Sequence, residues 1–253
     1  MTEIHADGLS GRVYSSNRPA VSTPEPVYVL VHGIGVSHRY FSRLHHLLAK
    51  TATVHSLDLP GFGGTPTPGR QLSIEDYGEF IRLALLQLGI TSCVLVGHSM
   101  GAQFVVEAAH KSPHLVDQLV LMGPVTDVRR RNPLRQGWDL TLDSLLTETP
   151  KTNWLVVSDY VRCGPRWYFT ELPVMLRYPM EDRLAMLGTP VLVLRGAQDF
   201  VASRTWCKQL AGLAPAGQLV EIPGCGHVVQ YKAPDQVARA LARFVASRQR
   251  TGS

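Results

Sequence analysis

The feature that most constrains this chain is a serine placed between an apolar run and a helical pattern. Residues 94–96 lead into Gly97-His98-Ser99-Met100-Gly101, and apolar residues with helical spacing follow. A buried strand, a sharp turn that carries a serine and a helix behind it form a nucleophile elbow. The two glycines would let strand and helix approach closely, and the N–H of Met100 would point to where an oxyanion forms. The stretch therefore predicts Ser99 as a nucleophile.

Strands and helices alternate along most of the chain. Short apolar runs rich in β-branched residues predict buried strands at 27–31, 53–57, 94–96, 118–122, 190–194 and 218–222. Ser73, followed by Asp76, predicts the capped start of a helix that ends near Gly89. The fold class that we expect is α/β, with a mostly parallel central sheet flanked by helices. Near the N-terminus, residues 11–15 are interpreted as an edge strand.

The alternation breaks between the strand that ends at Met122 and the strand that begins near Pro190. This stretch is rich in proline and aromatic residues, and the spacing of leucines over 140–146 is helical. A segment of this length without strands favours an inserted helical unit over a loop. We therefore expect residues 1–123 and 189–253 to form the core and residues 124–188 to form a helical lid.

Composition narrows the function classes. The chain has 253 residues, of which 45% are hydrophobic and 18% charged, and this composition favours an ordered domain with a large core. The net charge of +5 comes with no nucleic-acid-binding motif, and no run of about 18 apolar residues predicts membrane insertion. The first residues do not have the pattern of a signal peptide, so we expect a cytoplasmic protein. We also expect free cysteines, no metal, no cofactor and a small-molecule substrate as the partner.

A nucleophilic serine needs a base and an acid that orients it, and two later loops supply both. Asp199 follows the strand at 190–194, in Arg-Gly-Ala-Gln-Asp. His227 follows the strand at 218–222, in Pro-Gly-Cys-Gly-His. The loops after parallel strands meet at one edge of the sheet, where ligands bind. The sequence therefore predicts a catalytic triad of Ser99, His227 and Asp199.

With these motifs the chain resembles the α/β-hydrolase superfamily, in its lid-bearing serine esterase and C–C hydrolase branch. The resemblance rests on five motifs in order: His32-Gly33-Ile34-Gly35, the loop 58–63, the elbow, residues 195–199 and Gly226-His227. It implies the order Ser, Asp, His for the triad. It also implies that the N–H of Ile34 is the second oxyanion donor beside the N–H of Met100.

Several positions keep two interpretations. Some hydrolases of this kind take the acid from the position of Asp127, although the context of Asp199 is the commoner one. His32 and Asp58 are interpreted as residues that brace loops, and His98 as a structural residue of the elbow that could also contact substrate. The candidate substrate contacts are Gly33, His98, Trp138, Trp167 and Val228.

A serine at the elbow argues against epoxide opening and halide displacement, and favours attack on a carbonyl. The leading hypothesis is hydrolysis of a carboxylic ester, including a lactone or thioester, with an apolar or aromatic group held by the lid. One alternative is hydrolysis of a C–C bond in a diketone-type ring-fission product, with lid arginines holding a carboxylate. An alternative from another class is a receptor that binds a small molecule without cleaving it.

Overall fold

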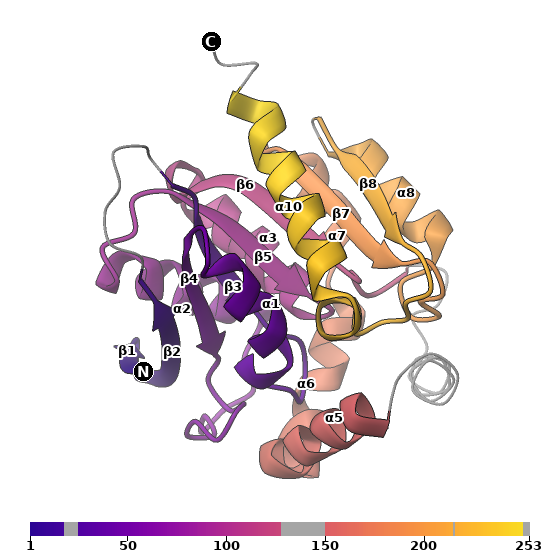
Figure 1. Ribbon diagram of the computed structural model, residues 1–253. Coiled ribbons are helices and arrows are strands. Elements are labelled where there is room, and N and C mark those ends of the chain that lie inside the picture. The colour runs from indigo at the N-terminus through magenta and orange to yellow at the C-terminus, as the bar shows by residue number, and fades with distance from the viewer. Residues whose placement is uncertain (18–24, 128–149, 215, 250–253) are drawn as a thin grey trace.

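The computed structural model describes residues 1–17, 25–127, 150–214 and 216–249. Within them, eight strands form one sheet in the order β1-β2-β4-β3-β5-β6-β7-β8 (Figure 1). The pairs β1–β2 and β2–β4 are antiparallel, and every other pair is parallel. The strands are β1 (Thr2–Ala6), β2 (Leu9–Ser16), β3 (Val27–Val31), β4 (Thr53–Asp58), β5 (Cys93–His98), β6 (Val116–Met122), β7 (Val191–Gly196) and β8 (Gln218–Ile222). The mostly parallel sheet that the sequence predicts is confirmed.

Alternate residues of the central strands face two separate cores. In β3, Val29 and Val31 belong to one core and Leu30 to the other, because successive side chains of a strand point to opposite faces. Helices cover both faces (Figure 1). One face packs against α1 (Ser42–Leu48) and α10 (Pro234–Gln249). The other packs against α2 (Ile74–Gln87), α3 (Gly101–Lys111) and α8 (Arg204–Leu213). Burial on both faces explains why these strands are apolar without interruption.

The chain order of the strands reverses next to β3. From β3 the chain moves to β4 on one side, and β5 then pairs with the other side of β3. The loops that leave the carboxyl ends of β3 and β5 therefore diverge, and ligands of open α/β sheets bind in the crevice at such a point. These two loops carry Gly33 and Ser99.

Three described helices lie between β6 and β7: α5 (Pro150–Cys163), α6 (Pro165–Arg177) and α7 (Met180–Ala185). They agree with the helical content expected there, whereas the predicted helical turn at 140–146 lies outside the described residues. The helix α5 contacts the short 3₁₀ helix η1 (His38–Phe41) in the loop after β3. Whether residues 124–188 act as a lid stays a prediction. No helix in the described part of the chain is both long and apolar enough to cross a membrane.

The N-terminal region corrects one expectation. The segment interpreted as an edge strand is the inner strand β2, which lies between β1 and β4. The edge is β1, in which only Ile4 and Ala6 are buried, so its sequence gives little apolar signal. The hairpin turns at Asp7 and Gly8, which both have positive φ, as a tight two-residue hairpin turn requires.

Candidate active site

Ser99 has the backbone conformation of a nucleophile elbow. Its φ is 56°, in the left-handed region that non-glycine residues rarely occupy. The two glycines around it are needed for close packing. A Cβ at Gly97 would lie 2.3 Å from the carbonyl oxygen of Gly101, and a Cβ at Gly101 would lie 2.5 Å from that of His32. Ser99 is partly exposed, whereas His98 and Met100 on either side are buried. The turn therefore presents the serine to the solvent side of a buried junction.

The neighbouring strand fixes the position of the turn. The N–H of Ser99 donates to the carbonyl oxygen of Met122 at the end of β6 (2.9 Å). The next residue, Gly123, lies against the ring of His227, since a Cβ there would lie 3.1 Å from Nδ1 and Cε1. The end of β6 therefore contacts the serine through one residue and the histidine through the next.

Asp199 and His227 form a buried pair. Nδ1 of His227 lies 3.0 Å from Oδ2 of Asp199, and Oδ1 of Asp199 accepts from the N–H groups of Val201 and Ala202 (2.8 Å each). Burial alone would raise the pKa of Asp199. The facing imidazole of His227 and the hydrogen bonds outweigh burial, and they lower that pKa below its ordinary value. Asp199 is therefore ionised and accepts a hydrogen bond from the protonated Nδ1 of His227.

Asp127, the alternative acid, bonds to a different element. Oδ2 of Asp127 accepts from the hydroxyl of Ser203, the residue that caps α8 (2.8 Å). The geometry therefore favours Asp199 over Asp127 as the acid of the triad.

The two predicted oxyanion donors lie in loops with well-defined hydrogen bonds. Nε2 of His32 accepts from the N–H of Leu59 (3.1 Å), so its protonated Nδ1 donates to the carbonyl oxygen of Gly33 (2.7 Å). In a trans peptide the C=O and the following N–H point in opposite directions, so this bond fixes the direction of the Ile34 N–H. In the described part of the chain, no hydrogen bond uses the N–H of Ile34 or of Met100. Both groups are available to a ligand.

The candidate substrate contacts occupy different surroundings. Gly33 lies against the nucleophile, because a Cβ there would lie 3.3 Å from Oγ of Ser99. Val228 is buried directly after His227. Trp167 is buried and packs its indole against Gly61 in the loop after β4. Trp138 lies outside the described residues. Of the candidates outside the elbow, Gly33 is thus in direct contact with Ser99.

His98 is placed in a way that favours the structural interpretation over substrate contact. Its side chain is 2% exposed. Nδ1 lies 2.7 Å from the hydroxyl of Tyr40, and Nε2 lies 2.9 Å from the carbonyl oxygen of His227. Both ring nitrogens therefore have partners within the protein. The interpretation of His32 and Asp58 as bracing residues also agrees with the structure, since Asp58 accepts from the N–H of His38 (2.7 Å).

Sequence reasoning missed Tyr40 and Glu171. Glu171 on α6 is fully buried and accepts from the N–H of Leu72 through Oε1 (3.1 Å). Burial raises the pKa of Glu171 to about 7. A glutamate within a helix gives no sequence signal of burial, and its hydrogen-bond partner Leu72 lies 99 residues away in the sequence.

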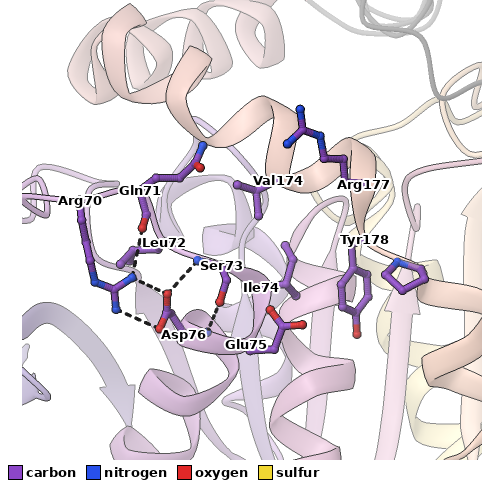
Figure 2. A pocket seen from close by; sticks show the side chains of 11 residues that line it. Arg70, Gln71, Leu72, Ser73, Ile74, Glu75, Asp76, Val174, Arg177 and Tyr178 are labelled. Atoms are coloured by element: carbon purple, nitrogen blue, oxygen red, sulfur yellow. Dashed lines mark hydrogen bonds and ion pairs between the residues drawn. The ribbon is translucent and has the colours of Figure 1, made fainter.

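Beside this contact a cavity of about 390 Å³ lies between residues 70–76 and the end of α6 (Figure 2). Arg70 pairs there with Asp76, and Ser73 and Asp76 form the predicted capping box of α2. The residues that line this cavity do not include Ser99, His227 or Asp199.

Among the described residues, no group of three or more histidine, cysteine and acidic side chains is arranged to hold a metal. The four cysteines are buried and form no disulfide.

A mostly parallel sheet with a serine elbow after β5, an acid after β7 and a histidine after β8 has the architecture of an α/β hydrolase. The sequence model of the α/β hydrolase family matches residues 28–240, so the chain belongs to this family.

Relatives and solved structures agree with this assignment. The chain is 24% identical to (E)-2-((N-methylformamido)methylene)succinate hydrolase from Acinetobacter baylyi, over 87% of this chain and 90% of that protein. The fold is similar to that of a thermophilic esterase from Thermogutta terrifontis, with a TM-score of 0.82, 18% identity and coverage of 98% and 99% of the two chains. It is also similar to a meta-cleavage product hydrolase from Pseudomonas fluorescens, with a TM-score of 0.75, 21% identity and 98% coverage of both.

Proposed function

We propose that this protein is a serine hydrolase that cleaves a carboxylic ester, lactone or thioester of an apolar or aromatic small molecule. Two observations carry the proposal: the buried Asp199–His227 pair, and a serine held at φ 56°. They are linked through the end of β6, where Met122 bonds to Ser99 and Gly123 lies against His227. The left-handed backbone conformation of Ser99 costs conformational energy, and the buried carboxylate of Asp199 needs several hydrogen bonds to be stable. The family assignment to hydrolases supports the same conclusion.

The mechanism follows from the atoms that the site provides. Oγ of Ser99 attacks the carbonyl carbon while Nε2 of His227 takes the hydroxyl proton, and Asp199 stabilises the imidazolium. The N–H groups of Ile34 and Met100 bind the oxyanion of the tetrahedral intermediate. The C–O bond then breaks, and His227 gives its proton to the leaving alkoxide. Water then attacks the acyl carbon while His227 takes its proton. The bond from the acyl carbon to Oγ breaks, His227 returns the proton to Oγ of Ser99, and the acid leaves.

The proposed substrate class rests on the helices inserted between β6 and β7. The rings of Tyr160 and Tyr168 pack directly on the oxyanion loop, because a Cβ at Gly35 would lie 2.6 Å from the first ring and 3.0 Å from the second. We assign residues 124–188 the role of a lid that covers Ser99. An aromatic surface next to the carbonyl-binding loop supports an apolar or aromatic acyl or alcohol group.

Short and medium p-nitrophenyl esters test the proposal. The expected result is turnover with a burst of one equivalent of nitrophenol, together with labelling of Ser99 by a fluorophosphonate. Ser99→Ala should lose both, whereas Ser112→Ala, at another buried serine, should keep both. A wild-type protein that neither turns over any ester nor reacts with the fluorophosphonate would contradict the proposal and favour a binding protein. Reaction with a diketone at a higher rate than with any ester would favour the C–C hydrolase.

A further inference from the structure

A chain of hydrogen bonds links three loops behind the candidate active site. The N–H of Gly33 donates to the hydroxyl oxygen of Tyr40 (3.0 Å), which lies 2.7 Å from Nδ1 of His98. Nε2 of His98 in turn lies 2.9 Å from the backbone carbonyl oxygen of His227. Gly33 follows β3, His98 ends β5, and His227 follows β8. One continuous chain therefore joins the oxyanion loop, the elbow and the loop of the proposed base.

The direction of every proton in this chain follows from chemistry. A carbonyl oxygen can only accept, so Nε2 of His98 carries a proton and donates it to His227. In the neutral ring Nδ1 is then an acceptor, and the hydroxyl of Tyr40 must donate to it. That leaves a lone pair of the same hydroxyl oxygen for the N–H of Gly33. Every hydrogen bond in this chain therefore pairs one donor with one acceptor.

Burial keeps the side chains of His98 and Tyr40 neutral. Burial, and then the repulsion from a charged His227, lower the pKa of His98 to about 3. Burial holds the pKa of Tyr40 well above its ordinary value. The rings of His98 and His227 have centroids 4.7 Å apart. A positive charge on His98 would oppose the proton that His227 takes up, so a neutral His98 is the state that suits a neighbouring base.

We propose that Tyr40 and His98 are positioning residues that hold the oxyanion loop at Gly33 and the backbone of His227 in fixed register with Ser99. This inference rests on the proposed hydrolase function. The donor Ile34, the proposed nucleophile Ser99 and the proposed base His227 come from separate loops, and a displacement of about 1 Å between such groups typically costs about a hundredfold in rate. The chain of bonds connects all three loops through two buried side chains, Tyr40 and His98.

Variants at the two residues test the inference, with acylation by a p-nitrophenyl ester as the readout. Tyr40→Phe removes the hydroxyl and should lower the acylation rate constant at least roughly tenfold, with KM changed less than about twofold. His98→Gln keeps an N–H that can reach the carbonyl of His227, so it should retain more activity than His98→Leu. Tyr77→Phe is the matched control. Tyr77 is also fully buried, but its hydroxyl donates to the carbonyl oxygen of Pro60. This variant should keep the wild-type rate.

Two measurements do not depend on activity. Nitrogen-15 NMR of the wild-type imidazoles should find His98 protonated at Nε2 and not at Nδ1 between pH 5 and 8. Hydrogen exchange at the Gly33 amide should be faster in Tyr40→Phe than in wild type. An Nδ1–H tautomer, unchanged exchange at Gly33, or equal rates for Tyr40→Phe and Tyr77→Phe would each overturn the inference.

The outcomes separate the inference from the proposed function. A wild-type protein that does not react with esters or fluorophosphonate removes the proposed function, and the NMR and exchange results then decide whether the hydrogen-bond chain holds the loops together. A reactive wild type with a fully active Tyr40→Phe variant leaves the function in place and overturns the positioning role.

Discussion

Gly123 lies against the imidazole of His227, so closely that a Cβ there would require a shift of a few tenths of an ångström. A Cβ there would lie 3.1 Å from Nδ1 and Cε1 of His227 and 3.4 Å from Oδ2 of Asp199. Gly123 also has a φ of 52°. The residue after β6 is thus adapted in both space and conformation to the acid–base pair.

Gly123→Ala should lower kcat by at least about tenfold, because the methyl group displaces His227 from its position between Asp199 and Ser99. It should also lower the free energy of unfolding by about 1 kcal/mol, since alanine is strained at positive φ. Gly89→Ala is the control. Its φ is 68°, and a Cβ there would have nothing within 4 Å. The control should lose similar stability and keep full activity, and equal activity losses in both variants would exclude the proposed crowding.

Asp199→Asn should lower kcat by roughly 10⁴, as removal of the orienting carboxylate does in serine proteases. Asp127→Asn should lower kcat less than about twofold, since Asp127 accepts a hydrogen bond from Ser203, the cap of α8. Measurement of kcat for both variants decides between the two acids. The reverse order of effects would assign the acid to the loop after β6.

Replacement of Ser99, the proposed nucleophile, should separate the energetic cost of its backbone conformation from the loss of catalysis. Ser99→Ala and Ser99→Gly should both abolish turnover. Glycine adopts φ 56° without strain, so Ser99→Gly should be more stable than Ser99→Ala by about 1 kcal/mol in denaturant unfolding. Equal stability of the two variants would show that the elbow conformation carries no energetic cost.

Glu171 should make stability depend on pH in an unusual direction. Its pKa rises from 4.5 to about 7 on folding, mainly through burial, so the folded chain holds a proton that the unfolded chain releases. Its contribution to the free energy of unfolding is fully present below about pH 4.5. The contribution falls as the pH rises to about 7, by about 3 kcal/mol in total.

Glu171→Gln should remove this dependence while keeping an oxygen that accepts from Leu72. The free energy of unfolding of Glu171→Gln, relative to that of wild type, should therefore rise between pH 4.5 and 7, as measured by denaturant unfolding. Glu79→Gln is the control: the hydrogen bond from Arg82 lowers the pKa of Glu79, so its contribution is lost only as the pH falls below about 4.5, and this variant should give a nearly flat difference between pH 4.5 and 7. A flat difference for Glu171→Gln across this range would contradict the prediction.

Much of the sheet could be predicted because its strands are buried on both faces and its helices begin at recognisable residues. The run 118–122 reads as a strand from its apolar residues alone, and Ser73 with Asp76 caps α2 as expected. The hairpin of β1 and β2 could not be found in the same way, since one face of each strand is polar. Its Asp7-Gly8 turn was the signal available.

Within the site, the sequence identified residues that sit in motifs after strands, such as Ser99 and His227. It did not identify Tyr40, whose hydroxyl matters only because folding brings η1 to the end of β5. The partner of Tyr40 is 58 residues away, and nothing in the local sequence relates the two. Contacts of this kind depend on the packing of separate elements, which periodicity and turn chemistry do not encode.

The bond from the Ser99 N–H to the carbonyl oxygen of Met122 joins two main-chain groups. Any residue at position 122 offers the same carbonyl, so no substitution there removes this anchor. The chain leaves the sheet for the inserted helices immediately after this point. Ser99, the proposed nucleophile, is therefore held by the register of the sheet, and a change in the length or sequence of the inserted segment leaves this bond in place. Substrate range and bond-breaking chemistry can evolve separately in such an arrangement.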